Sequence, residues 1–293
     1  MGRPFQLMMA RRTAEAFLRK EGITTLPVDP FAIAESRDIL VQPKPDTEPG
    51  VSGMLLRHGN SFGILYATHI QSLGFQRFSV SHELGHYFLE GHIDQVLKGG
   101  VHSSHAGFVT ADPYELEADH FAAGLLMPET PFRAAMDDVE HGLCGIEALA
   151  DQCITSLTAT AIRYAELTRK AAAVIVSTGD TIDYCFMSDA MKTLPKLVWL
   201  RKGTKLPAGT ATARLAGDPA KVRAGARVTD EADVRDWLGG TTSQGISEES
   251  IGLGGYGKLL TVLSSSTIGR EEDDCDDEDD EEALVEKWTP RFR

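Results

Sequence analysis

Two histidines and a glutamate in the stretch SVSHELGHYFLEGH, residues 79–92, have the spacing of a metal-binding helix. If this stretch is helical, His82 and His86 lie one turn apart on the same face, so both imidazoles can reach one tetrahedral ion. Glu83 then lies beside the ion without binding it, where a carboxylate can take a proton from a water molecule. The pattern predicts a zinc site with His82 and His86 as metal ligands and Glu83 as the catalytic base.

The third ligand can come from two places, and the sequence favours a second helix. His92 has the spacing of the last histidine in HExxHxxGxxH sites, but the glycine that turns the chain in those sites is missing here. The segment DPYELEADHFAAGLLMPETP, residues 112–131, reads as a helix with Glu115 and Asp119 one turn apart on one face. We predict Glu115 as the third ligand and Asp119 as the residue that holds a histidine ligand from behind. Glu117 is the alternative on the same helix.

The two motifs together resemble the ImmA/IrrE family of metallopeptidases, in which an HExxH helix precedes a helix of the form E-x-x-A-D/N-x-F-A-x-x-L-L-M-P. HELGH and ELEADHFAAGLLMP carry the resemblance, which is strong over residues 77–131 and softer on both sides. It implies a zincin-like fold, a Zn²⁺ cofactor and cleavage of a DNA-binding transcriptional repressor with a helix-turn-helix, in a stress or mobile-element response. Composition and spacing do not reveal the repressor.

An alternative function is a non-proteolytic, zinc-containing transcriptional regulator or signal-binding protein. A structural zinc site usually fills all four positions with protein ligands, often cysteines. Cysteines stand only at 144, 153, 185 and 275, far from His82 and His86 and without a CxxC pair. The sequence therefore favours a zinc metallo-endopeptidase, a hydrolase acting on peptide bonds.

The residue that stabilises the developing oxyanion stays open at this point. The candidates are side chains near the two motifs that can donate a hydrogen bond: Arg77, His102, His105, Tyr114 and His120.

Composition favours a cytoplasmic protein. Hydrophobic residues make up 42% of the 293 residues, no run of eighteen apolar residues exists, and the N-terminal segment does not read as a signal peptide. The net charge is −14, but the run EEDDCDDEDDEE at 271–282 carries eleven of the negative charges and leaves only −3 for the rest. Acidity is thus a property of a tail that we expect to be disordered.

The order of predicted elements indicates an α+β protein with four regions. These are a catalytic region (1–140), a helix-turn-helix-like helical segment (141–171), a smaller mixed α/β domain (172–268) and the acidic tail (269–293). The family resemblance implies that the first is a zincin-like metallopeptidase domain and that the third is similar to GAF or PAS sensors. In the first region, residues 52–57 and 61–67 read as a hairpin. Residues 63–67 are either a strand edge that aligns the substrate or an ordinary internal strand. Residues 92–113, between the two metal helices, are expected to form a flap over the cleft.

The helical segment reads as two helices with Ser156 as the N-cap of the second. That second helix offers Arg163, followed by Arg169 and Lys170, so direct DNA binding is possible, but we favour a structural or repressor-docking role. In the third region we expect strands at 171–177, 181–186, 196–203, 210–216 and 257–265 and a short helix at 230–238.

Overall fold

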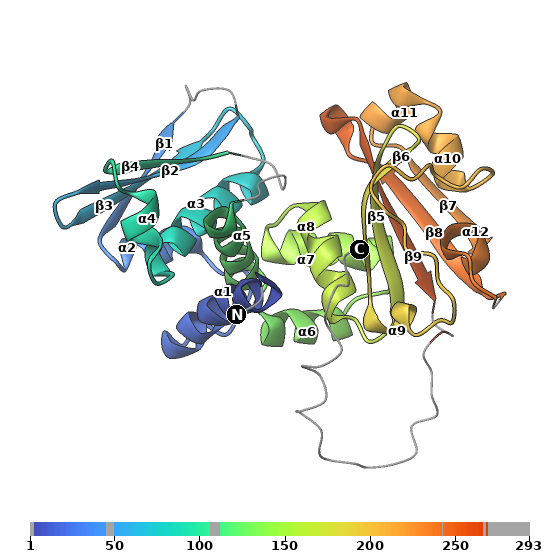
Figure 1. Ribbon diagram of the computed structural model, residues 1–293, viewed down its shortest axis with the longest axis horizontal. Coiled ribbons are helices and arrows are strands. Elements are labelled where there is room, and N and C mark those ends of the chain that lie inside the picture. The colour runs from blue at the N-terminus through green and yellow to red at the C-terminus, as the bar shows by residue number, and fades with distance from the viewer. Residues whose placement is uncertain (1–2, 45–49, 106–111, 242, 266–267, 269–293) are drawn as a thin grey trace, which may run out of the picture.

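The structure consists of two lobes, each with its own β-sheet, joined by a helical segment (Figure 1). The computed structural model describes residues 3–44, 50–105, 112–241, 243–265 and 268, so the acidic tail lies outside the described residues. The chain is α+β, as predicted. Among the described residues, no helix has both the length and the hydrophobicity that a bilayer crossing requires.

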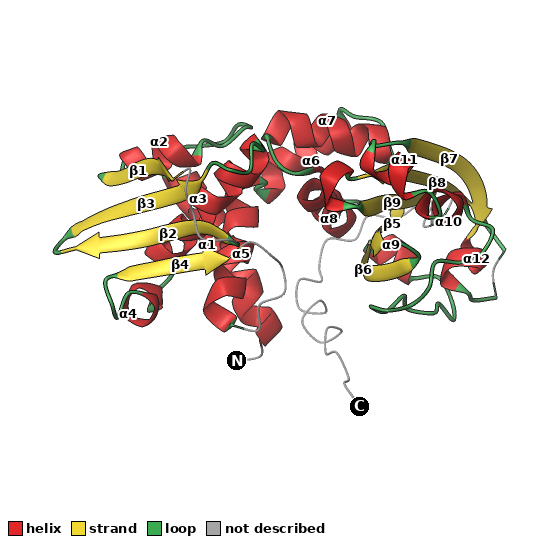
Figure 2. Ribbon diagram, turned by 90° about the horizontal axis from the view of Figure 1, so that it is seen from above, coloured by secondary structure: helices red, strands yellow, loops and turns green. Residues whose placement is uncertain are grey.

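The first lobe contains a four-stranded sheet packed against helices. Its elements are α1 (Arg3–Lys20), α2 (Pro30–Glu35), β1 (Ile39–Lys44), β2 (Val51–His58), β3 (Ser61–Ala67), α3 (Leu73–Phe88), α4 (His92–Val96), β4 (Val101–His105) and α5 (Pro113–Leu126). Figure 2 shows the strands side by side in the order β1-β3-β2-β4. β1 runs parallel to β3, whereas β2 pairs antiparallel with both β3 and β4.

Two glycines let the site-bearing helices approach their neighbours. A Cβ on Gly53 of β2 would lie 2.6 Å from Oε1 of Glu83, and a Cβ on Gly85 of α3 would lie 3.0 Å from Cα of Ala118 in α5. Both distances are too short for a side chain, so these glycines allow α3 to lie between the sheet and α5. Apolar side chains complete this core: Leu55, Ile64, Val80, Leu84, Phe121 and Leu125.

The helical segment packs on the second sheet. It comprises α6 (Glu129–Asp137), α7 (Leu143–Cys153) and α8 (Leu157–Leu167). The predicted helix pair is confirmed: Ile154 ends α7 in the left-handed region with φ 53°, and the Ser156 side chain caps α8 by accepting from the Ala159 N–H. Ile146 and Leu149 of α7 share a core with strands of the second lobe.

The second lobe is a five-stranded antiparallel sheet in the order β6-β5-β9-β8-β7. Its elements are β5 (Ala171–Thr178), β6 (Thr181–Met187), α9 (Asp189–Lys192), α10 (Ala211–Ala216), α11 (Pro219–Arg223), β7 (Arg227–Asp233), α12 (Val234–Leu238), β8 (Gly245–Gly252), the 3₁₀ turn η1 (Gly254–Tyr256) and β9 (Lys258–Ser265). Val174 and Val176 face α7 and α8, whereas Ile175 faces the core that includes Leu215 and Trp237. Both faces of the sheet are therefore covered (Figure 1).

Several predicted elements differ from the structure. Residues 196–203 form no strand, and 210–216 form helix α10, because the Thr210 side chain caps it by accepting from the Ala213 N–H. The predicted helix at 230–238 begins only at Val234, and its first part is strand β7. Within the predicted flap, α4 and β4 are regular elements, and 106–111 lie outside the described residues. β3 lies between β1 and β2, so of the two alternatives for residues 63–67 the ordinary internal strand is confirmed and the sheet edge is not.

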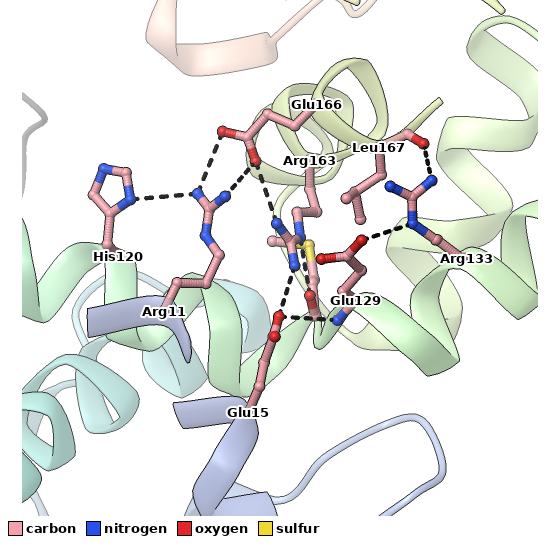
Figure 3. Close-up of polar contacts among 9 residues, drawn as sticks. Arg11, Glu15, His120, Glu129, Arg133, Arg163, Glu166 and Leu167 are labelled. Carbon is pink, nitrogen blue, oxygen red and sulfur yellow. Dashed lines mark hydrogen bonds and ion pairs between the residues drawn. The ribbon is translucent and has the colours of Figure 1, made fainter. Parts of the chain in front are cut away.

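A buried ionic network ties α8 to the first lobe (Figure 3). Arg163 is only 2% exposed. Its guanidinium donates to Glu15 Oε1 of α1 at 3.0 Å and to the carbonyl of Met127 at 3.0 Å. Beside it, Arg11 of α1 pairs with Glu166 of α8 at 2.9 Å. Arg163 is thus occupied inside the protein and is not available to contact a nucleic-acid phosphate in this arrangement.

Candidate metal centre

Two capped helices position the predicted metal ligands. The Ser72 side chain accepts from the Phe75 N–H at the start of α3, and the Asp112 side chain accepts from the Tyr114 N–H at the start of α5. The predicted helix start at Asp112 and Pro113 is confirmed, with Pro113 in the first turn. Both caps fix where each helix begins, and therefore which face of each helix is turned toward the other.

His82, His86 and Glu115 converge on one point. The two Nε2 atoms of His82 and His86 are 3.1 Å apart. The Glu115 carboxylate lies 3.3 Å from His82 Nε2 and 3.2 Å from His86 Nε2. The structure thus brings together the three residues that the sequence predicts as ligands, with ligand atoms within 4.8 Å of one another.

Asp119 lies behind His82, as expected from its place one turn after Glu115. Its Oδ1 is 2.9 Å from His82 Nδ1. A hydrogen bond from Nδ1–H to this carboxylate fixes the ring so that the lone pair of Nε2 faces the cluster. Two imidazoles and a carboxylate form a donor set that suits zinc, so these residues fit the ion that the sequence predicts.

The charges and hydrogen bonds around His82, His86 and Glu115 favour a positively charged group at the point where the three side chains meet. Burial lowers the pKa of His82, but hydrogen bonds with Asp119 and Glu115 outweigh burial and raise it to about 10. Burial resists ionisation of Glu115, yet its hydrogen bonds with His102, His82 and His86 hold the pKa of the carboxyl well below its usual range. Burial lowers the pKa of His86 to about 3, which leaves that imidazole neutral. A metal ion at this point would replace the proton of His82.

Glu83 lies next to the cluster and carries no hydrogen bond. It is 0% exposed, and neither carboxylate oxygen has a partner in the described part of the chain. Its carboxylate is within 4.8 Å of the ligand nitrogens of His86 and His102. Burial raises the pKa of Glu83 to about 6, although the neighbouring His82 and the Ser104 hydroxyl oppose the shift. An unpartnered buried carboxylate requires an explanation, and a role in catalysis supplies one.

One of the proposed oxyanion stabilisers, His102, lies in the cluster. It comes from β4, and its Nε2 is 2.9 Å from Glu115 Oε1. His105 is exposed on the same strand, and His120 Nδ1 faces Arg11 at 3.3 Å instead. The alternation of His102 and Ser104 along residues 101–105 was the available signal, but the sequence analysis interprets this segment as a flap.

Tyr114 and Arg77, the other candidates for that role, are placed differently. The Tyr114 ring packs edge-on against the His92 ring, with centroids 5.0 Å apart. Arg77 is buried and donates to the carbonyl of Val28. Its guanidinium is therefore held at the segment before α2.

The alternative third ligands lie outside the convergent group. His92 Nδ1 is 3.1 Å from His86 Nδ1, the nitrogen of His86 that faces away from the cluster. Glu117 Oε2 is 3.1 Å from His92 Nε2. His92 and Glu117 therefore stand behind His86, much as Asp119 stands behind His82, and the sequence analysis did not anticipate this arrangement.

Comparisons with known proteins give a family match and a similar fold. The family model Peptidase_M78, described as the IrrE N-terminal-like domain, matches residues 34–147. Among solved structures, the chain is similar to a Mycobacterium tuberculosis transcriptional regulator with a TM-score of 0.55, at 14% identity, over 87% of this chain and 76% of that chain. At this identity the likeness concerns the fold alone. No curated protein matches the chain in sequence at a significant level.

Proposed function

Residues 34–147 of this chain belong to the Peptidase_M78 family of IrrE N-terminal-like domains, and from that premise we propose that the chain is a zinc-dependent endopeptidase. Members of this family generally bind a metal. The observation that carries the proposal is the convergence of His82, His86 and Glu115 beside a buried, unpartnered Glu83. We propose the first three as zinc ligands, Glu83 as the catalytic base and Asp119 as the residue that orients His82.

A zinc ion held there would supply a Lewis acid and lower the pKa of a water molecule to about 7. Glu83 accepts the proton of the attacking water and later delivers it to the leaving amine. Its pKa of about 6 lies close enough to neutrality for both transfers. His102, with Nε2 at the cluster, is the best-placed donor to the carbonyl oxygen that gains negative charge.

β4 is the best-placed strand to align the substrate. It is an edge strand, since it pairs with β2 and with no other strand in the described ranges. An extended peptide adding beside β4 would run past His102 and Glu83. We therefore assign substrate alignment to β4 and not to residues 63–67.

We propose that the substrate is a DNA-binding repressor protein in the cytoplasm, and that cleavage relieves repression in a stress or mobile-element response. The fold shared with a Mycobacterium tuberculosis transcriptional regulator is compatible with a role in gene control but does not distinguish this function from the competing one. We also propose a zincin-like fold for 1–140, a helix-turn-helix-like segment at 141–171, a GAF- or PAS-like domain at 172–268 and an acidic tail at 269–293. The antiparallel sheet with helices on both faces supports the third assignment.

The competing function is a regulator that binds DNA or a signal without proteolysis. A Mycobacterium tuberculosis transcriptional regulator has a similar fold, so the fold is compatible with this function. Burial of Arg163 argues against DNA reading by α8, because this helix keeps its central basic side chain inside the protein.

Substituting Glu83 distinguishes the two functions. Glu83→Gln should bind zinc as wild type does but cleave about 10²- to 10⁴-fold more slowly, because it removes the general base and no ligand. We would incubate the zinc-loaded proteins with a peptide library from a digested bacterial proteome, and with purified helix-turn-helix repressors from the source genome, and identify cleaved bonds by mass spectrometry. Glu90→Gln, an exposed glutamate just after α3, is the matched control. If wild type and Glu83→Gln cleave equally, or wild type cleaves neither substrate, the proteolytic function is wrong.

A further inference from the structure

The two candidate metal ligands His82 and His86 have different partners at Nδ1, the ring nitrogen that faces away from the cluster. Nδ1 of His82 faces a carboxylate directly, at 2.9 Å from Asp119. Nδ1 of His86 faces another imidazole, His92 Nδ1, at 3.1 Å, and His92 Nε2 in turn lies 3.1 Å from Glu117 Oε2. A carboxylate therefore stands behind both histidines, but the one behind His86 is reached through His92.

The chemistry of imidazole allows only one direction of hydrogen bonding along this chain when His86 binds a metal. A neutral imidazole has one N–H and one lone pair. If Nε2 of His86 gives its lone pair to the metal, Nδ1 of His86 carries the proton and donates it to His92 Nδ1. The proton of His92 is then on Nε2, where it donates to Glu117. Each atom in the chain has the partner that this arrangement requires.

The fold builds this arrangement from two elements. Gly91, with φ 79°, turns the chain just after α3, so that His92 begins α4 beneath His86. Glu117 lies on α5, two residues past Glu115, and so points away from the cluster. Tyr114, one turn before Glu117 on that helix, packs against the His92 ring. His92 is 1% exposed, which removes water as a competing partner.

We propose that His92 and Glu117 are positioning residues that orient His86 through a Glu117–His92–His86 hydrogen-bond chain and thereby strengthen metal binding. This inference rests on the zinc site of the proposed function. The carboxylate of Glu117 polarises His92, and the polarised His92 makes Nε2 of His86 a better electron donor. Since both nitrogens of His92 are engaged in the chain, His92 is not itself the third ligand.

Glu117→Gln tests the charge at the end of the chain. The amide can still accept a hydrogen bond from His92, but it is neutral, so we expect zinc affinity to fall about tenfold, within the range typical of such partners. Affinity would be measured on the purified full chain by competition with a chromogenic chelator. The absorption bands of Co²⁺ bound in place of zinc should shift as well, because they report the ligand field at the metal. Asp94→Asn, an exposed carboxylate on α4, is the matched control and should change neither reading.

Two substitutions of His92 test the connection itself. The amide of His92→Gln can accept from His86 and donate to Glu117, whereas His92→Phe keeps an aromatic ring against Tyr114 and can do neither. We expect zinc affinity in the order wild type, His92→Gln, His92→Phe. Thermal unfolding of the metal-free proteins checks that each variant is folded. If His92→Phe does not fold, Glu117→Gln still tests the inference.

The inference is overturned if Glu117→Gln binds zinc as tightly as wild type with unchanged Co²⁺ bands, or if His92→Phe binds at least as tightly as His92→Gln. Neither result affects the proposed function, since wild type still binds zinc in both. A wild-type chain that binds no zinc would instead overturn the metal site and the proposed function with it.

Discussion

Glu83 in the first lobe and Glu248 in the second are buried to the same degree, and their surroundings differ. Glu83 is 0% exposed and Glu248 is 1% exposed. The Glu248 carboxylate accepts from the backbone N–H and the hydroxyl of Thr212, both at 2.6 Å, and from the indole of Trp237 at 3.2 Å. Glu83 forms no hydrogen bond of normal geometry in the described part of the chain, although the buried Ser104 hydroxyl is close enough to lower its pKa.

This difference separates a structural carboxylate, Glu248, from Glu83, the carboxylate that we propose as the catalytic base. Glu248 joins strand β8 to α10 and α12, so its hydrogen bonds stabilise the second lobe and occupy three of the carboxylate's roughly four lone-pair sites. Glu83 keeps its lone pairs free beside the candidate ligands, and the protein bears the cost of burying it. Burial alone therefore does not identify a functional residue; the number of hydrogen-bond partners does.

The largest effect is expected where the buried carboxylate is structural. Glu248→Leu leaves the Thr212 N–H and the Trp237 indole without their acceptor, whereas the Thr212 hydroxyl still has the Ser250 hydroxyl at 2.6 Å. We therefore expect the free energy of unfolding to fall by about 3 kcal/mol. Urea unfolding followed by circular dichroism measures this. Glu231→Leu, an exposed glutamate on the adjacent strand β7, should cost less than about 0.5 kcal/mol. Equal losses in the two variants would mean that the partners of Glu248 contribute nothing.

An intermediate effect on stability is expected from the titration of His120. Its partner Arg11 is positively charged and therefore favours the neutral form of the imidazole. Burial, then the adjacent Arg11, lowers the pKa of His120 to about 4, against smaller opposing effects of Glu166 and Asp119, and Arg163 also lowers it. Between pH 4 and 6.5 the unfolded chain thus binds more protons than the folded one, so stability falls as the pH is lowered through this window.

The measurement is the urea-unfolding free energy of metal-free protein at pH 7 and pH 5. His120→Asn keeps an acceptor for Arg11 but does not titrate, so wild type should lose about 2 kcal/mol more than this variant between the two values. The same loss in both proteins would show that His120 is protonated in the fold without penalty.

The comparison also explains which parts of the structure were predictable. Helices α3 and α5 have local signals: the HExxH spacing, the Asp112 cap and the proline after it. These signals lead to His82, His86 and Glu115, which the structure brings together, because residue spacing within a helix is fixed by its period. Strand β8 lacks a local signal, since its buried face carries Ile246, Glu248 and Ser250, and two of these are polar. Their partners, Thr212 and Trp237, are distant in sequence.

For the same reason, the order of the strands and the contacts formed across turns could not be predicted from local sequence patterns. β3 is internal because β1, more than fifteen residues earlier, pairs beside it in parallel. His102 reaches the cluster only because β4 returns to pair with β2. The Glu117–His92–His86 chain depends on the turn at Gly91, whose direction the sequence does not specify.

The smallest expected effect on the free energy of unfolding is that of Glu83→Gln, and it is the only one of these changes expected to stabilise the protein. Replacing a buried carboxylate that has no partner by a neutral amide removes a desolvation penalty, so Glu83→Gln should leave the metal-free protein at pH 8 as stable as wild type or up to about 1 kcal/mol more stable. Urea unfolding in the presence of a chelator measures this, beside Glu248→Gln, which should be destabilised because the amide carries less charge for three donors to share. If Glu83→Gln lost as much stability as Glu248→Gln, the Glu83 carboxylate would have to be held by groups as strong as those around Glu248. It would then be a structural residue, and the contrast between the two lobes would not hold.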